Sequence, residues 1–532
     1  AAAGGIGLWA AAQASRQAPP RLEGTRARAE EVARAALRER GALVDGWTAD
    51  VTTTAGDAAA RAYVWSEAPG EFERLEGAWF GAPRWIVRFA DWSAPPEQRA
   101  EEYRVWIGVD GAVARVQHLL PEGAPGARLD AEAARALALE AVRERLGLEP
   151  AELRVVEADE ESRPERSDWT FELVRRGLLD DVPAEARVRV SLAGDEVVDV
   201  ARYVRVPESW ERERRRTGTR TLMLRGGLAA LLAVGFGAAA VAAVVAWSRR
   251  RLPMRAFRRL SAAAAAAALL WAVTAWPAIG AGLSTAQPRR LQVVAALTVL
   301  AILVAIAVPA VGLVGALASG WLDEPRRGRE RSAEARPDGR VPLVGAAWGL
   351  LLGGALDAMR LLAGTPPPTA RVAGAAAGVP LLDGVAAALP PWLVGTAGLL
   401  WLLGLRARHG STAAAQGAGW GLFIAVAVAS VPEGLHGSLV AWAAAALVTA
   451  AVLRIGFRAL ASAPAAAPLA TAALLGLQLL ELSWTAPYPG ARAGGFLALA
   501  TLTAAALAWS RELEEGSAGR SDPVAGEARL GG

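Results

Sequence analysis

The 532-residue sequence predicts a helical membrane bundle of about nine spans, joined to one soluble α+β domain made of two similar modules. Three observations predict this fold class. Nine apolar segments of about 20 residues follow position 225, and each is long enough to cross a bilayer as a helix. Residues 16–221 hold 32 of the 57 basic residues and 39 of the 53 acids. Within them, two stretches repeat one order of amphipathic helix and alternating strands.

Missing residue types exclude several kinds of chemistry. The sequence has no Cys, Lys or Asn, so every basic residue is Arg. Without Cys it can form no disulfides, thiolate metal sites or cysteine nucleophiles. The 3 His are scattered and no glycine-rich phosphate loop is present, so we expect no metal and no cofactor. Arg residues are not interleaved with aromatic residues in patches, and we expect no nucleic-acid partner.

The chain opens with an apolar segment. Residues 1–10 read Ala-Ala-Ala-Gly-Gly-Ile-Gly-Leu-Trp-Ala. This composition is typical of a signal sequence or of a first membrane anchor, and about a dozen apolar residues are too few to choose between them by length. We therefore interpret 1–15 as the remnant of one or the other.

Residues 16–128 and 129–208 form the two expected modules. Each begins with an amphipathic helix that ends at a glycine, and each helix carries Arg-Glu-Arg just before that end. An aromatic strand follows later in each module. The corresponding segments are 29–41 and 131–147 for the helices, and 85–89 and 169–174 for the strands.

Each aromatic strand precedes an alternating strand pair, at 103–116 and 187–200. Turn dipeptides at 110–111 and 194–195 predict that these pairs are antiparallel hairpins. One helix on three or four such strands gives a module of about 80–100 residues. The first module carries an extra segment near 51–65.

Two polar stretches of this region are expected to lie outside the modules' regular structure. The acidic run at 157–161 is interpreted as a solvated loop. Residues 209–225 are interpreted as a juxtamembrane linker between the second module and the first span.

The transmembrane bundle is expected over 226–509, with a polar cytoplasmic tail at 510–532. Tryptophans near several segment ends fit the preference of indoles for membrane interfaces. The nine segments are 226–247, 261–283, 291–321, 343–363, 385–405, 413–431, 437–457, 465–484 and 494–509.

The placement of Arg predicts the orientation. The loops after the first, third, fifth and seventh segments, with the tail, carry 19 Arg, whereas the alternate loops carry 4. Because cytoplasmic loops are enriched in Arg, the Arg-rich loops are expected in the cytoplasm. The protein is then a multi-pass protein of the inner or plasma membrane. Residues 16–221 are extracytoplasmic, and the bilayer is the first partner.

The module plan resembles the PepSY module, a small extracytoplasmic domain found with membrane proteins and peptidases. The whole layout resembles the amino-terminal region of long proteins of the CPBP (CAAX-type) intramembrane protease group. The features that carry this second resemblance are the end of the soluble domain at 206–210 and the loops at 285–288 and 486–490. The resemblance implies an external binding or regulatory domain on a bundle related to a protease.

The protease motifs themselves are absent. That group carries Glu-Glu-x-x-x-Arg on one membrane helix and Phe-x-x-x-His on another. Here Asp323 and Glu324 lie in a predicted cytoplasmic loop with Gly328 at the Arg position. Glu514 and Glu515 lie in the tail, again without Arg at the required spacing, and no Phe precedes His by four residues. The catalytic residues cannot be carried over, and the resemblance implies a non-catalytic or truncated relative.

Few polar residues lie in the predicted spans, and such residues are candidates for function because burying them in lipid is costly. Glu433 and His436 form Glu-x-x-His, which either is part of a solvated turn or supplies two metal ligands. Asp357 and Arg360, three apart, form either a neutral pair or a polar point in a substrate or ion path. Glu481 is the most isolated acid. Glu481, Glu433 and His436 are the catalytic candidates if catalysis exists.

The preferred hypothesis is a non-enzymatic membrane protein. Its external domain binds a peptide or an envelope protein, and the bundle anchors it or relays its state in signalling. One alternative is a divergent intramembrane peptidase that depends on Glu481 or Glu433. The other is a transporter, although the apolar segments show no inverted repeat. The sequence predicts no oligomeric state.

Overall fold

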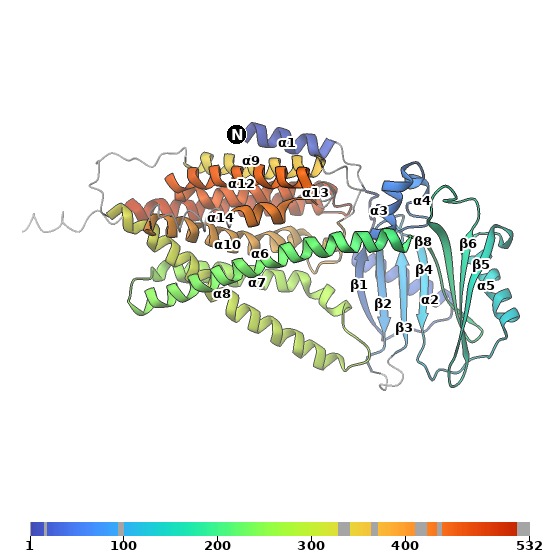
Figure 1. The fold of residues 1–532 in the computed structure, drawn as a ribbon. Coiled ribbons are helices and arrows are strands. Elements are labelled where there is room, and N and C mark those ends of the chain that lie inside the picture. Colours follow the sequence, from blue (N-terminus) through green and yellow to red (C-terminus); the bar gives the residue numbers. More distant parts are fainter. Residues whose placement is uncertain are drawn as a thin grey trace, which may run out of the picture.

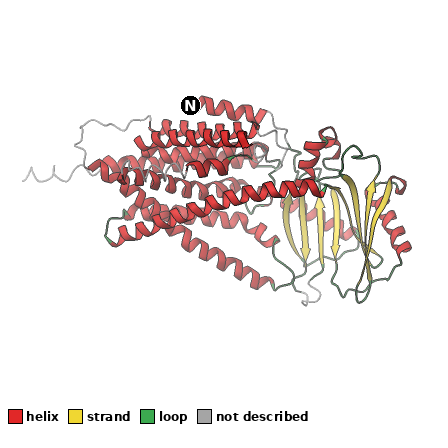
Figure 2. Cartoon of the chain, viewed as in Figure 1, coloured by secondary structure: helices red, strands yellow, loops and turns green. Residues whose placement is uncertain are grey.

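The computed structural model describes residues 2–14, 19–93, 100–327, 341–362, 371–409, 423–432 and 439–518. A long bundle of helices carries a small strand-rich domain at one end (Figure 1). The strands are confined to this end, whereas the bundle is helical throughout its described length (Figure 2). A mostly helical protein with a separate two-sheet domain was predicted, and this part of the fold class is confirmed.

The domain consists of two modules with the same element order, a helix followed by a four-stranded antiparallel meander. The first module comprises α2 (Arg26–Glu39), β1 (Thr48–Thr54), β2 (Arg84–Ala90), β3 (Glu102–Ile107) and β4 (Val113–Leu119). The second comprises α5 (Ala131–Leu146), β5 (Leu153–Ser162), β6 (Ser167–Arg175), β7 (Glu185–Ala193) and β8 (Glu196–Arg205).

Equivalent residues build the two modules. Each helix begins at a side-chain cap, since Thr25 accepts from the Arg28 N–H and Asp130 accepts from the Ala133 N–H. The buried indoles of Trp85 and Trp169 occupy matching places in the second strand of each sheet. Trp85 Nε1 donates to the Glu23 carbonyl at 2.9 Å, and Trp169 Nε1 donates to the Leu129 carbonyl at 3.1 Å. In both modules the indole therefore ties the core to the chain just before the helix.

The extra segment of the first module is displaced from its expected position at 51–65. Residues 51–54 belong to strand β1, which pairs with β2. The insertion is instead α3 (Ala58–Glu67), η1 (Pro69–Glu71) and α4 (Phe72–Leu75), between β1 and β2. Its side chains, among them Tyr63 and Phe72, pack in one core with the second module. The insertion therefore helps to hold the two modules together.

The acidic run at 157–161 is strand and not a loop, so that interpretation was wrong. These residues lie in β5, the edge strand of the second sheet, and pair with β6. Every side chain from Glu157 to Ser162 is exposed. A row of acids on an edge strand repels the same edge of another molecule, which is how edge strands avoid aggregation.

Eight helices in the described ranges are long and apolar enough to cross a membrane. They belong to α6 (Glu208–Ser248), α7 (Met254–Ala281), α8 (Arg289–Arg327), α9 (Val341–Leu362), α10 (Pro380–His409), α12 (Leu439–Ser462), α13 (Ala467–Thr485) and α14 (Ala491–Ala518). The expected span at 413–431 lies largely outside the described residues, although 423–430 are helical.

The expected linker at 209–225 is not a separate segment. It forms the first part of α6, a continuous helix of 41 residues that begins directly after the second module. At 1.5 Å per residue this helix is about 60 Å long, roughly twice the thickness of the bilayer's hydrocarbon core. Its amino-terminal part therefore extends beyond the membrane, beside the soluble domain (Figure 1).

Close helix packing centres on α9. A Cβ on Gly345, Gly349 or Gly353 would collide with η5 (Pro464–Ala466) or α13, so these glycines allow the close approach of the backbones. A second face of α9 meets α1 (Ala2–Ala14), where Gly5 and Gly354 lie against one another. The predicted amino-terminal apolar segment is thus a helix packed on the bundle.

Candidate functional site

Among the described residues, the first module contacts three connections of the bundle, those between α7 and α8, before α10, and between α13 and α14. Thr53 Oγ1 donates to the Val372 carbonyl at 2.9 Å, and the Leu22 N–H donates to the Pro487 carbonyl at 2.7 Å. Val372 is buried in the same core as the first module's sheet, and Tyr488 packs against this core. The bundle connections therefore complete the core of the first module.

A charged network joins the sheet to the connection between α7 and α8. Arg88 of β2 forms a buried ion pair with Glu102 of β3. Arg88 Nη1 also donates to the Leu283 carbonyl at 2.6 Å, and Thr285 Oγ1 donates to Glu102 at 2.9 Å. Burial alone would raise the pKa of Glu102, but the hydrogen bonds and the charge of Arg88 hold its pKa below the ordinary value. Glu102 therefore stays ionised at the interface.

A second charged contact lies beside it. Arg289 at the start of α8 is 3.8 Å from Asp50 of β1 and donates to Thr48 Oγ1 at 3.3 Å. Burial raises the pKa of Asp50, although Arg289 and Arg88 oppose the shift. The domain thus meets the bundle through oriented polar contacts as well as apolar ones.

The two modules meet edge to edge through β4 and β8. Arg115 forms a bidentate pair with buried Asp199, with Nε–Oδ1 at 2.7 Å and Nη2–Oδ2 at 2.5 Å. Fork-to-fork pairing of this kind fixes direction as well as distance. The relative position of the two sheets is therefore set by side chains.

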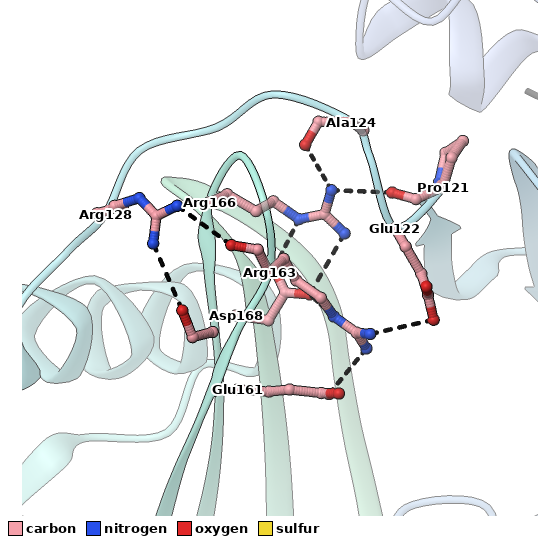
Figure 3. Close-up of polar contacts among 9 residues, drawn as sticks. Pro121, Glu122, Ala124, Arg128, Glu161, Arg163, Arg166 and Asp168 are labelled. Atoms are coloured by element: carbon pink, nitrogen blue, oxygen red, sulfur yellow. Dashed lines mark hydrogen bonds and ion pairs between the residues drawn. The ribbon is translucent and has the colours of Figure 1, made fainter. Parts of the chain in front are cut away.

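The segment between the modules is also held in place (Figure 3). Buried Arg166 donates to the carbonyls of Pro121 and Ala124 at 2.9 and 2.7 Å, and its Nε donates to Asp168 at 2.7 Å. Neighbouring Arg163 pairs with Glu122 at 3.2 Å. These contacts tie the linker to the hairpin of β5 and β6.

A cavity of about 560 Å³ opens between the modules. His118 lines it, stacked on Tyr103 with ring centroids 4.0 Å apart. Its Nδ1 lies 2.8 Å from Glu196 and its Nε2 lies 3.0 Å from Glu101. Burial would lower the pKa of His118, but the two carboxylates outweigh it and raise the pKa to about 9. His118 is therefore a cation at neutral pH. Arg40 and Arg145 complete the charged lining of this cavity.

The structure brings together three of the five polar residues that the sequence offered as separate candidates. Arg360 Nη1 lies 2.7 Å from Asp357 Oδ1 and 3.6 Å from Glu481 Oε2. Both carboxylates are buried. One guanidinium between two acids offsets part of their charge inside the bundle. Glu433 and His436 lie outside the described residues.

Within the described ranges, no group of three or more His, Cys, Asp or Glu residues is placed to hold a metal ion. The sequence signals for the other sites were indirect. The repeated Arg-Glu-Arg before each helix end marked Arg40 and Arg145 as equivalent, but only the packing of the modules brings both to one cavity. No signal in the sequence paired Arg88 with the connection between α7 and α8.

Comparison of the chain with protein-family models, with curated proteins and with solved structures gives no match.

Proposed function

We propose that this chain is a multi-pass protein of the cell membrane whose extracytoplasmic domain binds a peptide or an envelope protein and passes its state to the helix bundle. The observation that carries the proposal is the docking of the first module on three bundle connections. A domain that only binds a ligand would need no contact with the bundle other than its covalent connection to α6.

The nature of the contacts supports a relay. Arg88, Glu102 and Thr285 form a directional network, so a shift of the sheet changes hydrogen bonds to the ends of α7 and α8. Interfaces of this kind have discrete arrangements and transmit small displacements. The shared core around Val372 links the same sheet to the start of α10.

The orientation is proposed from charge. All three connections that contact the domain belong to the Arg-poor set, and the Arg-rich helix ends lie together at the other end of the bundle. There Arg259 pairs with Glu512 at 2.6 Å, and Arg408 lies over the Trp321 ring at 5.2 Å. The positive-inside rule then puts the domain outside the cytoplasm.

We also propose that the two modules are related to PepSY and the whole layout to the CPBP group. In this chain the bundle is then non-catalytic. The pairing of Glu481 with Arg360 favours a structural role for this acid over water activation. For that reason we prefer a binding and relay function to the peptidase and transporter alternatives.

Hydrogen exchange on the full chain in lipid nanodiscs tests the relay. Arg115→Ala removes the bidentate contact between the modules. We expect faster exchange both in β4 and β8 and in the bundle connections at 281–289 and 371–378. Arg143→Ala is the matched control, because Arg143 is exposed on α5 and its nearest acid is 3.9 Å away. Changes confined to β4 and β8 would contradict the relay.

A further inference from the structure

We infer that the cavity between the modules binds a carboxylate, specifically the free C-terminus of a short peptide with an apolar last side chain. This inference names the ligand class of the binding function proposed above and rests on it for the biological role. The cavity itself, its charges and its apolar lining carry the chemistry.

Two guanidinium groups, one from the carboxyl end of each module's helix, meet at the cavity. Arg40 follows the last turn of α2, and Arg145 lies in the last turn of α5. Arg145 Nη2 donates to the Val197 carbonyl at 3.0 Å, which fixes it beside the turn of β7 and β8. Among the residues that the structure describes, no acid forms an ion pair with either Arg40 or Arg145. Partial burial, and then the charge of Arg40, lower the pKa of Arg145, although the carboxylates of Asp199, Glu196 and Glu144 oppose the shift.

Both arginines are exposed, and the carboxylates nearest the cavity are engaged by another group. Glu196 and Glu101 are both bound by His118, at 2.8 and 3.0 Å. Among the residues that line the cavity, protonated His118, Arg40 and Arg145 face one carboxylate, that of Glu196, while Asp199 and Glu144 act on Arg145 from outside the lining. A bound monoanion offsets part of this excess, and a carboxylate accepts charge-assisted hydrogen bonds from guanidinium groups.

The rest of the lining is apolar and fits a side chain. Ala42, Val197 and Val198 line the cavity with partly exposed side chains, beside the ring of Tyr103. Its volume of about 560 Å³ falls in the range of small-ligand sites, which is roughly 300–1,000 Å³. A peptide end, with its carboxylate on the arginines and an apolar side chain on these residues, uses both parts of the lining. A simple inorganic anion would use only the charged part.

The bound group would touch both modules. Arg40 and His118 belong to the first module, and Arg145 and Glu196 to the second. Occupancy of the cavity therefore reinforces the contact already made by Arg115 and Asp199. This places the ligand at the joint whose movement the bundle would sense.

Calorimetric titration of the full chain in nanodiscs tests the inference. The probes are tripeptides ending in Leu with a free carboxylate, the same tripeptides as C-terminal amides, and inorganic phosphate. We expect the free peptides to bind, and the amides to bind about tenfold more weakly because a charge-assisted bond is lost. Arg40→Ala and Arg145→Ala should each weaken the free peptide about tenfold, and Arg40→Lys should weaken it less. Arg143→Ala, outside the cavity, should bind as the wild type does.

Several outcomes would overturn the inference. They are no binding of any free tripeptide, equal binding of the amides, binding of phosphate alone, or equal loss in the Arg143→Ala variant. The relay is judged separately, by hydrogen exchange without any peptide. If the free peptides bind but Arg115→Ala leaves hydrogen exchange in the bundle connections unchanged, the inference stands and the relay is contradicted. The reverse result contradicts only the inference.

Discussion

Three buried or half-buried arginines make directional contacts between parts of this molecule. Arg88 joins the domain to the bundle, Arg115 joins the two sheets, and Arg166 holds the linker. Each guanidinium bonds a carboxylate and, for Arg88 and Arg166, main-chain carbonyls as well. Five N–H donors in a planar fork allow this combination, whereas a lysine ammonium would not reproduce it.

The carboxylates within the bundle lead to a first prediction. Replacing Arg360 by Met removes a counter-charge from buried Asp357 and Glu481. We expect the bundle to lose about 2 kcal/mol of stability, because a buried carboxylate without its cation is costly. Adding Asp357→Asn to Arg360→Met should restore much of the loss in a thermal unfolding assay in detergent. A double variant that is no more stable than Arg360→Met would argue against charge balance as the role of this cluster.

The imidazole of His118 leads to a pH prediction. Its folded pKa of about 9 exceeds the ordinary value of 6.5, so its protonated form is stabilised by folding. That stability is fully present below pH 6.5 and is lost as the pH rises through about 9. The thermal midpoint of the wild type should therefore fall over this range more than that of His118→Gln. Histidine NMR can follow the titration directly, since the chain has 3 His. An imidazole titrating near 6.5 would contradict the contacts with Glu101 and Glu196.

Among single residues, the sequence indicated the contact of Asp357 with Arg360 but not the charged contacts of the domain. The spacing of Asp357 and Arg360 on one helix is enough to predict their pairing. Glu481 joins them only through the packing of α9 on α13, which no local pattern specifies. His118 and Arg40 become parts of one site only when the modules are assembled.

The sequence predicted helices and strands correctly where apolar residues recur with a helical or strand period. Both modules' helices and aromatic strands were predicted, because alternating and helical apolar patterns mark them. Strands β1 and β5 lack that pattern, because β1 is mostly Thr and the second half of β5 is acidic and exposed. The helical nature of 209–225 was missed because charged residues there suggested a linker, although nothing in them ends a helix.

The glycines of α9 lead to a prediction about helix packing. A Cβ at position 349 would collide with the Ala470 carbonyl, a backbone atom that cannot move alone. Gly349→Ala should therefore destabilise the bundle by about 2 kcal/mol through overpacking. Gly395→Ala is the matched control, because Gly395 lies in α10 with no atom within 4 Å of the new methyl group. Equal thermal midpoints for the two variants would show that the approach of α9 and α13 is looser than described.

For the whole molecule, the distribution of Arg over the bundle connections matches the set of connections that contact the domain. The sequence predicted which connections share a side of the membrane from the distribution of Arg alone. In the structure the described Arg-poor connections meet the domain. The docking itself could not be predicted, because it depends on main-chain carbonyls such as those of Leu283 and Val372, which every sequence offers.

Cysteine labelling in intact cells can show whether the domain docked on the bundle lies outside the cytoplasm. The wild-type chain has no Cys, so single substitutions report one position each. Glu160→Cys places a thiol on the exposed edge of β5, and Arg255→Cys places one at the exposed start of α7. In intact cells a membrane-impermeant maleimide should label Glu160→Cys and should label Arg255→Cys only after permeabilisation. Labelling of Arg255→Cys in intact cells, with Glu160→Cys protected, would contradict the account.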